Sequence, residues 1–154
     1  MEGAILLFDV DRLQRINDLL GYMVGDEVLQ LLGQKCHELV GVTFYRGQGG
    51  KFYCITTDLD RDKIEWIYQQ VKRFGEEVPR EMKLEIQLTI SCGVAFFPQD
   101  AEDFETLHAN VEYALEQAKK DGRGCIAQFS GKMHRRTVEQ FQLQEVLRLS
   151  LIHI

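Results

Sequence analysis

The hydrophobic positions along this chain recur with two periods, which predict short strands and amphipathic helices. Residues 4–8 form a continuous apolar run, typical of a strand that is buried on both faces. Residues 84–90 alternate between apolar and polar side chains, which predicts a strand with one face in water. Shorter β-rich runs predict three more strands, at residues 42–46, 52–56 and 125–129. Apolar residues that return every three or four positions predict four helices, at residues 12–20, 26–39, 63–74 and 104–118.

The predicted elements follow one another in the order βααββαβαβ, and a glycine-rich turn joins two of the strands into a hairpin. This order predicts an α/β (α+β) fold, in which helices flank a mixed central sheet that is built around the hairpin. A chain of 154 residues is long enough for one domain with a substantial core. We place that domain at residues 1–130.

The last part of the chain differs from the rest. Residues 132–149 have only a thin apolar seam and predict a polar helix. We interpret residues 131–148 as a connector that leads towards a further domain. Residues 149–154 read Leu-Ser-Leu-Ile-His-Ile, which one reading frame of a widely used sequencing adapter encodes. We therefore expect a non-native tail there and give His153 no functional weight.

Composition and charge narrow the classes of function. The net charge of −6 and the pI near 5.2 argue against a general binder of nucleic acid or of anionic membranes, because both need a basic face. No apolar run approaches the roughly 20 residues that cross a bilayer. We therefore expect a cytoplasmic domain, with any membrane anchor elsewhere in the parent protein. The four widely separated cysteines are expected to be buried thiols: Cys36, Cys54, Cys92 and Cys125.

A strand-to-helix segment carries the strongest functional signal. Residues 8–21 read Phe-Asp-Val-Asp-Arg-Leu-Gln-Arg-Ile-Asn-Asp-Leu-Leu-Gly, and residues 24–29 read Val-Gly-Asp-Glu-Val-Leu. This pattern resembles the nucleotide-binding core of the GGDEF family, the diguanylate cyclases. The resemblance covers about residues 5–129 and lacks the helix that precedes the family's first strand. It implies the nucleotide-cyclase or palm-like fold of that family.

Two acids at the end of the first strand are candidate metal ligands. Joining two GTP molecules into cyclic di-GMP requires carboxylates that hold divalent ions in line with the attack. Asp9 directly follows five apolar residues, where a charge needs a partner, and is the better candidate. For Asp11, metal ligation and capping of the next helix are equally good interpretations. The resemblance implies Asp9 and the carbonyl of Val10 as the Mg²⁺ ligands on this side.

The opposite side of such a site would come from the hairpin turn, where the family carries Gly-Gly-Asp/Glu-Glu-Phe. This chain reads Arg-Gly-Gln-Gly-Gly-Lys-Phe-Tyr at residues 46–53. In the preferred register Gly50 stands at the metal-binding acid and Lys51 at the following glutamate. A shift by one residue puts Lys51 and Phe52 at the acid positions, so neither register supplies a carboxylate. Lys51 either replaces a metal ion as a fixed positive charge or points into solvent, and the sequence leaves both open.

The residues that would bind the nucleotide are better preserved. The resemblance implies Asn17 and Asp26 as the guanine-binding pair, because an amide and a carboxylate can read the guanine edge. The alternatives are an outward-facing polar side chain for Asn17 and a helix cap for Asp26. Lys119 and Arg123 match the cations that hold the triphosphate, although cations near a helix C-terminus also offset the helix dipole.

Other features of the family are replaced or carry no chemistry. Gln14 stands where many members have a lysine near the phosphates. Leu39 and Val42 occupy the positions of the Arg-x-x-Asp product-inhibition motif. Ser91 and Gly93 match the family's Ser-x-Gly strand, which we interpret as structural.

These observations together predict a degenerate GGDEF domain that binds GTP without diguanylate cyclase activity and acts as a regulatory module. An active diguanylate cyclase and a structural dimerisation domain without nucleotide are the alternatives. The predicted partners are GTP, a second copy of the domain, and a covalently linked sensor or EAL-type domain. Mg²⁺ is predicted as a weak or vestigial cofactor.

Overall fold

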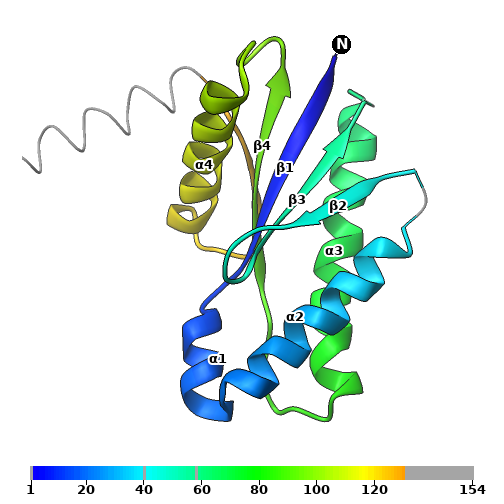
Figure 1. The fold of residues 1–154 in the computed structure, drawn as a ribbon, viewed down its shortest axis with the longest axis vertical. Coiled ribbons are helices and arrows are strands. Elements are labelled where there is room, and N and C mark those ends of the chain that lie inside the picture. The colour runs from blue at the N-terminus through cyan, green and yellow to red at the C-terminus, as the bar shows by residue number, and fades with distance from the viewer. Residues whose placement is uncertain (1, 40, 58, 131–154) are drawn as a thin grey trace, which may run out of the picture.

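Five strands and four helices make up the part of the chain that the structure, a computed structural model, describes, namely residues 2–39, 41–57 and 59–130 (Figure 1). The strands are β1 (Gly3–Val10), β2 (Thr43–Arg46), β3 (Lys51–Thr56), β4 (Ile90–Phe97) and β5 (Ile126–Gln128). The helices are α1 (Leu13–Leu20), α2 (Tyr22–His37), α3 (Arg61–Glu81) and α4 (Phe104–Lys120). None of these described helices is long and apolar enough to cross a bilayer. The predicted connector at residues 131–148 and the predicted tail at residues 149–154 lie outside the described residues.

The strands form one sheet in the order β2-β3-β1-β4-β5, with β1 at its centre. β1 pairs antiparallel with β3 and with β4, whereas β5 pairs parallel with β4. Figure 1 shows α4 on one side of the sheet and α2 and α3 on the other. The predicted fold class, a mixed central sheet flanked by helices, is therefore confirmed.

The side chains of β1 divide between two cores, because successive residues of a strand point to opposite faces. Phe8 belongs to the larger core, which α2 and α3 cover, and it stacks on Phe52 with ring centroids 5.0 Å apart. Ile5 and Leu7 belong to the smaller core beneath α4. Asp9 continues the series of Ile5 and Leu7, so the strand carries this carboxylate to the α4 face of the sheet.

The strand predicted at residues 84–90 is wrong in its position. β4 begins at Ile90 and runs to Phe97, whereas residues 84–89 pair with no other strand in the described part of the chain. The side chains of residues 84–89 do alternate between shielded and exposed, as predicted. β1 ends at Val10, opposite Ile90, and one further backbone hydrogen bond joins the amide of Asp11 to the carbonyl of Thr89 at 2.9 Å. The alternation shows that one face of the segment is exposed to water, but it does not indicate whether the backbone is hydrogen-bonded to a neighbouring strand.

Two helices extend beyond their predicted bounds. α3 runs on to Glu81, well past its predicted end. α2 begins at Tyr22 instead of residue 26, because Gly21 alone joins it to α1. The φ of Gly21 is +92°, a conformation that glycine adopts at little cost. The earlier start of α2 puts Asp26 inside the helix.

Three of the four cysteines are buried, as predicted. Cys36, Cys54 and Cys92 lie in the larger core, and Cys125 is half-buried. Burial raises the pKa of Cys36 and of Cys54 to about 12. Neither thiol is therefore a reactive thiolate at neutral pH.

Candidate functional site

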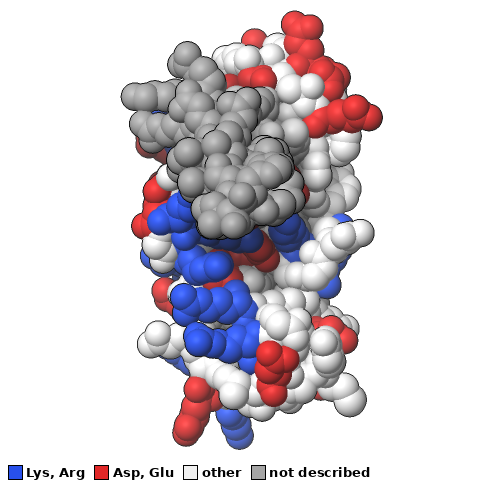
Figure 2. Space-filling model, turned by 90° about the vertical axis from the view of Figure 1, so that its left-hand side faces the viewer, with Lys and Arg blue, Asp and Glu red and all other residues white. Residues whose placement is uncertain are grey.

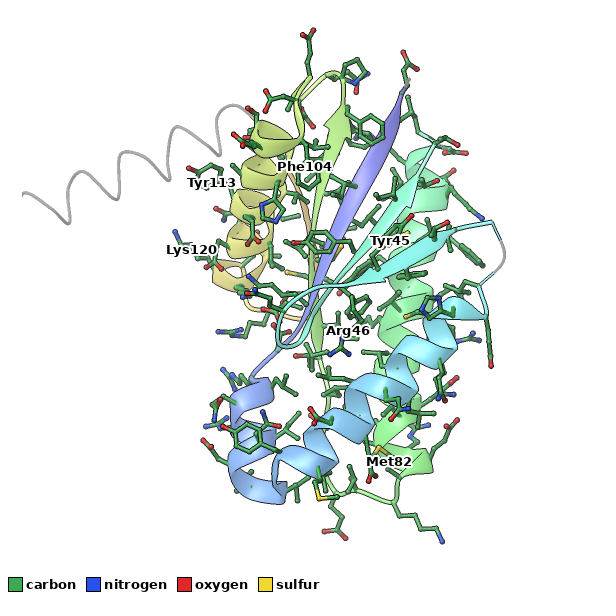
Figure 3. All side chains as sticks on the ribbon, viewed as in Figure 1. Tyr45, Arg46, Met82, Phe104, Tyr113 and Lys120 are labelled. Carbon is green, nitrogen blue, oxygen red and sulfur yellow. The ribbon has the colours of Figure 1, made fainter. Side chains whose placement is uncertain are left out.

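The end of β1, the turn between β2 and β3, and the end of α4 come together on the α4 side of the sheet. The amide of Gly47 donates to the carbonyl of Lys51 at 2.9 Å and closes the turn, while the amide of Val10 donates to the carbonyl of Gly50 at 3.0 Å and fixes the turn against β1. Figure 3 shows Arg46 beside this turn, and Lys120 on the outer side of α4. The neighbour of Lys120 on α4 faces inward and reaches β1.

That inward-facing residue is Lys119, which is paired with Asp9. The ammonium of Lys119 lies 2.6 Å from the carboxylate of Asp9, and only 18% and 16% of the two side chains are exposed. Burial by itself lowers the pKa of Lys119, but the hydrogen bond and charge of Asp9, with a further contribution from Glu116, raise it above its usual value. Lys119 is therefore charged at neutral pH and neutralises the carboxylate that was predicted to hold Mg²⁺.

Gly50 faces Asp9 from the hairpin turn. A Cβ atom added to Gly50 would lie 3.4 Å from Oδ1 of Asp9 and 3.3 Å from Cβ of Val10. An acidic side chain at this position would therefore start beside both predicted metal ligands. This geometry favours the register in which Gly50 stands at the metal-binding acid of the signature.

Lys51 is directed towards α4. Its ammonium lies 3.3 Å from the carboxylate of Glu112, which also lies 3.6 Å from the ring of His108. The ring of His108 in turn shares a hydrogen bond of 2.8 Å with the hydroxyl of Tyr53. The interpretation in which Lys51 points into solvent is wrong, because it pairs with Glu112. Its role as a fixed charge in place of a metal ion stays a prediction, and the cation that contacts Asp9 is Lys119.

The donors around Asp9 do not fit Mg²⁺. This ion demands near-ideal octahedral coordination by oxygen and tolerates no cation among its ligands. Asp9 offers one carboxylate, Gly50 offers none, and the ammonium of Lys119 already contacts the Asp9 oxygen. Within the described ranges no group of three His, Cys, Asp or Glu side chains could hold a metal ion. A weak Mg²⁺ site at Asp9 and Val10 stays a prediction that this donor set does not support.

The second acid of β1, Asp11, is surrounded by donors. The hydroxyls of Thr89 and Ser91 each donate to its carboxylate at 2.8 Å. The amide of Gly124 donates at 3.2 Å, and the guanidinium of Arg123 lies 3.3 Å away. These donors come from the start of β4 and from the turn after α4. Asp11 therefore ties three segments together at the end of β1.

The structure contradicts one interpretation of Asp11, the helix cap, and its hydrogen bonds argue against the other, metal ligation. The N-cap of α1 is Arg12 and carries no side-chain cap, so the capping interpretation is wrong. The donors occupy both carboxylate oxygens of Asp11, which is only 6% exposed, and this leaves it unavailable to a metal ion. Ser91, which we interpreted as structural, has a fully buried hydroxyl that needs a partner, and its partner is Asp11. Gly93 has a packing role, because a Cβ there would collide with the backbone of α4.

Asn17 and Asp26 come from two different helices and lie close together. A Cβ added to Gly25 would collide with the carboxamide of Asn17, so Asn17 lies directly against the residue before Asp26. Neither side chain has a hydrogen-bond partner among the described residues, and both are at least partly exposed. The helix-cap interpretation of Asp26 is wrong, because α2 already begins at Tyr22. The pair presents an amide and a carboxylate, the groups that can read a guanine edge.

The two cations predicted to hold a triphosphate are both engaged by acids of β1. Lys119 pairs with Asp9 and Arg123 pairs with Asp11. In the described part of the chain Asp9 is held by Lys119 alone, which also lies 3.5 Å from Glu116, whereas Arg123 shares Asp11 with three other donors. An incoming phosphate would therefore displace Asp9 from Lys119 more readily than Asp11 from Arg123.

The amino-acid sequence is similar to a known family and to much longer proteins. A family model described as "Diguanylate cyclase, GGDEF domain" matches residues 1–125. Cyclic di-GMP phosphodiesterase NbdA of Pseudomonas aeruginosa is 30% identical over 152 residues, which are 96% of this chain and 19% of that protein. Bifunctional diguanylate cyclase/cyclic di-GMP phosphodiesterase MucR of the same organism is 28% identical over 96% of this chain and 22% of that protein. The chain thus spans about a fifth of the length of these relatives.

Solved structures resemble the fold over most of the described residues. An EAL/GGDEF domain protein from M. capsulatus is 26% identical, with a TM-score of 0.71 over 84% of this chain and 85% of that chain. The active GGEEF domain of a diguanylate cyclase from Vibrio cholerae is 20% identical, with a TM-score of 0.72 over 84% of each chain. The second likeness concerns the fold alone.

Proposed function

The chain belongs to the GGDEF domain family, and on this premise we propose that it is a degenerate member, which binds GTP but does not join two GTP molecules into cyclic di-GMP. It acts as a regulatory module of cyclic di-GMP signalling. The proposal separates the two halves of the family's chemistry. Guanine recognition is kept, and metal-dependent activation of the 3′-hydroxyl is lost.

The observation that carries the proposal is the environment of Asp9. An active site of this kind needs a second carboxylate opposite Asp9, and Gly50 supplies no side chain at the position that faces it. Lys119 pairs with Asp9 instead, which puts a positive charge where a metal ion would have to bind. The alternative of an active cyclase would need another acid within reach, and Asp11, the nearest along the strand, is saturated by its own donors.

GTP binding is supported by the unpartnered pair at the junction of α1 and α2. Guanine offers two donors, its N1–H and its exocyclic amine, to a carboxylate such as Asp26, and adenine lacks this pattern. Asn17 supplies a neighbouring amide that can donate to the guanine carbonyl. The ammonium of Lys119 can donate hydrogen bonds to phosphate oxygens once it is released from Asp9. Binding of this kind does not need a divalent ion.

The regulatory role is supported by the size of the relatives. NbdA and MucR, whose names include cyclic di-GMP phosphodiesterase activity, are about five times as long as the matched segment. A domain that binds GTP without consuming it can report the nucleotide to a linked EAL-type domain or to a second copy of itself. We infer that such a linked domain is the target of this module.

The first prediction is that the protein makes no cyclic di-GMP from GTP in the presence of Mg²⁺ or Mn²⁺, because Gly50 supplies no second carboxylate opposite Asp9 and Lys119 already pairs with Asp9. Chromatography of the products would measure this, with the active GGEEF domain from Vibrio cholerae as the positive control. The Asp9→Ala variant supplies the background. Product clearly above that background would overturn the proposal in favour of an active cyclase.

The second prediction is that GTP binds more tightly than ATP and that binding persists with a chelator present. The Asp26→Ala variant should lose GTP affinity about 10-fold, because the two guanine donors lose a charged acceptor. Calorimetry measures both, with Asp18→Ala as the matched control, since Asp18 is an exposed acid on α1 whose one side-chain partner among the described residues is Gln14. Equal affinity for both nucleotides, or an equal loss in the two variants, would contradict guanine recognition.

A further inference from the structure

A cavity lies beside α1, and of the residues predicted to bind the nucleotide it contains only Arg123. Its volume is about 390 Å³, within the range of small-molecule pockets. It is bounded by α1, by the segment that precedes β4 (Ile86, Gln87 and Thr89) and by the turn after α4. The segment that was wrongly predicted as a strand thus forms one wall of this cavity.

Three arginines converge on the cavity from two parts of the chain. Arg12 and Arg15 come from α1 and its N-cap, and Arg123 comes from the turn after α4. The one acid among the lining residues is Asp11, whose carboxylate is buried and held by its own donors. Arg12 and Arg15 form no ion pair within the described part of the chain. The cavity therefore carries a net positive charge on a protein whose net charge is −6.

The surface around this cavity is basic as well. Figure 2 shows Lys and Arg side chains gathered in a band over the side of the molecule on which α1 and α4 lie. Positive charge concentrated in a hollow raises the local concentration of anions. The backbone of Arg12 and of Arg123 is left-handed, with φ of 57° and 64°, which is uncommon for a residue other than glycine and marks positions that the surrounding structure holds in place.

Helix geometry separates the cavity from the guanine-reading pair. Successive residues of an α-helix are rotated by about 100°, so Arg12, Arg15 and Leu19 share one face of α1. Asn17 projects from the opposite face, against Gly25 of α2. The cavity is therefore on the back of α1, and Arg123 alone belongs both to it and to the predicted triphosphate cations.

We propose that this cavity is a second anion-binding site, which takes a phosphate-bearing small molecule. Guanidinium groups suit phosphate because their planar arrays of donors match its oxygens. The apolar side chains of Ile16, Leu19 and Ile86 line the same cavity and would contact the organic part of the ligand, while Thr89 offers a further hydroxyl. The site goes beyond the proposed GTP-binding function and does not depend on it.

Titration of the ¹⁵N-labelled protein with AMP tests the site, because adenine lacks the donor pattern that Asn17 and Asp26 would read. Saturable shifts are expected at the amides of Arg15, Ile16 and Thr89, and they should fade as salt rises. Adenosine, which lacks the phosphate, should leave these signals unmoved. Inorganic phosphate at matched ionic strength shows whether the phosphate group alone is sufficient, and its binding at the same amides would also support the site.

The Arg15→Gln variant supplies the decisive comparison. It should weaken AMP about fivefold, the size of one partly screened charge-assisted hydrogen bond, and leave GTP affinity unchanged. The matched control is Arg73→Gln on α3, which removes the same charge from an arginine that pairs with Glu77. Shifts confined to Asn17, Asp26 and Lys119, no binding of either AMP or phosphate, or equal behaviour of the two variants would each overturn the proposal.

Discussion

Asp9 and Asp11 lie two residues apart at the end of β1 and differ in the number and kind of their partners. Among the residues that the structure describes, Asp9 has one side-chain partner, the ammonium of Lys119, at 2.6 Å. Asp11 has four, which are two hydroxyls, a backbone amide and a guanidinium. The carboxylate of Asp9 is 16% exposed, whereas that of Asp11 is 2% exposed. The same strand thus ends in one carboxylate that can change its partner and one that cannot.

This difference separates a carboxylate that serves the fold from one that could serve a ligand. A buried carboxylate with every lone pair engaged is costly to disturb, because each donor would be left without an acceptor. A carboxylate held by one flexible lysine can release it to a phosphate or, in a chain with an acid at Gly50, to a metal ion. In the family resemblance both acids belong to one motif, but their different partners indicate that Asp11 stabilises the fold and that Asp9 can contact a ligand.

The largest expected effect is on stability, and it falls on Asp11. The Asp11→Asn variant should lower the free energy of unfolding by about 3 kcal/mol or more, because a buried acceptor of four donors loses its charge and Arg123 loses its ion partner. Asp9→Asn should cost clearly less, because the new carboxamide oxygen can still accept from Lys119 and the ammonium also lies 3.5 Å from Glu116. Urea denaturation of the two variants measures the difference. Equal losses would erase the distinction between the two acids.

The fold and Asp9 were predictable from local patterns, but the partners of the acids were not. The spacing of hydrophobic residues predicted the strands and helices, and the apolar run before Asp9 indicated a charged residue at the end of a buried strand. The hydroxyl partners of Asp11 are 78 and 80 residues away in the sequence, and Arg123 is 112 residues away. Spacing carries no information on such contacts, because only the packing of β4 and α4 against β1 brings them together.

The errors in element position have a related cause. Residues 84–89 alternate like a strand because one of their faces is shielded, yet the strand pairing ends with Val10 and Ile90. Asp26 resembled a helix cap because it follows Gly25, whereas the chain turns at Gly21, one helical turn earlier. The end of strand pairing depends on the neighbouring strand, and the start of α2 depends on how it packs against α1. The spacing of apolar residues along the chain contains neither piece of information.

The second largest effect would come from restoring an acid opposite Asp9. The Gly50→Glu variant adds a carboxylate whose Cβ starts 3.4 Å from Oδ1 of Asp9. Two carboxylates repel each other and attract a divalent ion, so Mg²⁺ should displace Lys119 and raise GTP affinity about 10-fold over the value in chelator. Wild type should bind GTP equally in both conditions. Calorimetry with Mg²⁺ and with chelator measures the ratio.

A neutral variant of the same shape serves as a control for changes in the geometry of the turn. Gly50→Gln has the size of the glutamate and no charge, so its GTP affinity should not respond to Mg²⁺. The expectation fails if Gly50→Glu is also indifferent to Mg²⁺ while circular dichroism shows it folded. Asp9 would then be unable to exchange Lys119 for a metal ion, and the contrast with Asp11 would be smaller than the contacts suggest.

The smallest expected effect concerns Lys51. It tests whether Lys119 alone, or Lys51 as well, supplies a cation to the nucleotide beside Asp9. The ammonium of Lys51 pairs with Glu112 at 3.3 Å, with about a third of each side chain exposed. Such a pair contributes less than about 1 kcal/mol, so Lys51→Gln should change the free energy of unfolding little and GTP affinity not at all.

Lys119→Gln, which removes the same charge from the partner of Asp9, should weaken GTP binding about fivefold in chelator because a phosphate contact is lost. Parallel titrations of the two variants measure this. A loss of GTP affinity in Lys51→Gln as large as that in Lys119→Gln would mean that the hairpin turn itself delivers a cation to the nucleotide, and Asp9 and Lys119 would then not act alone.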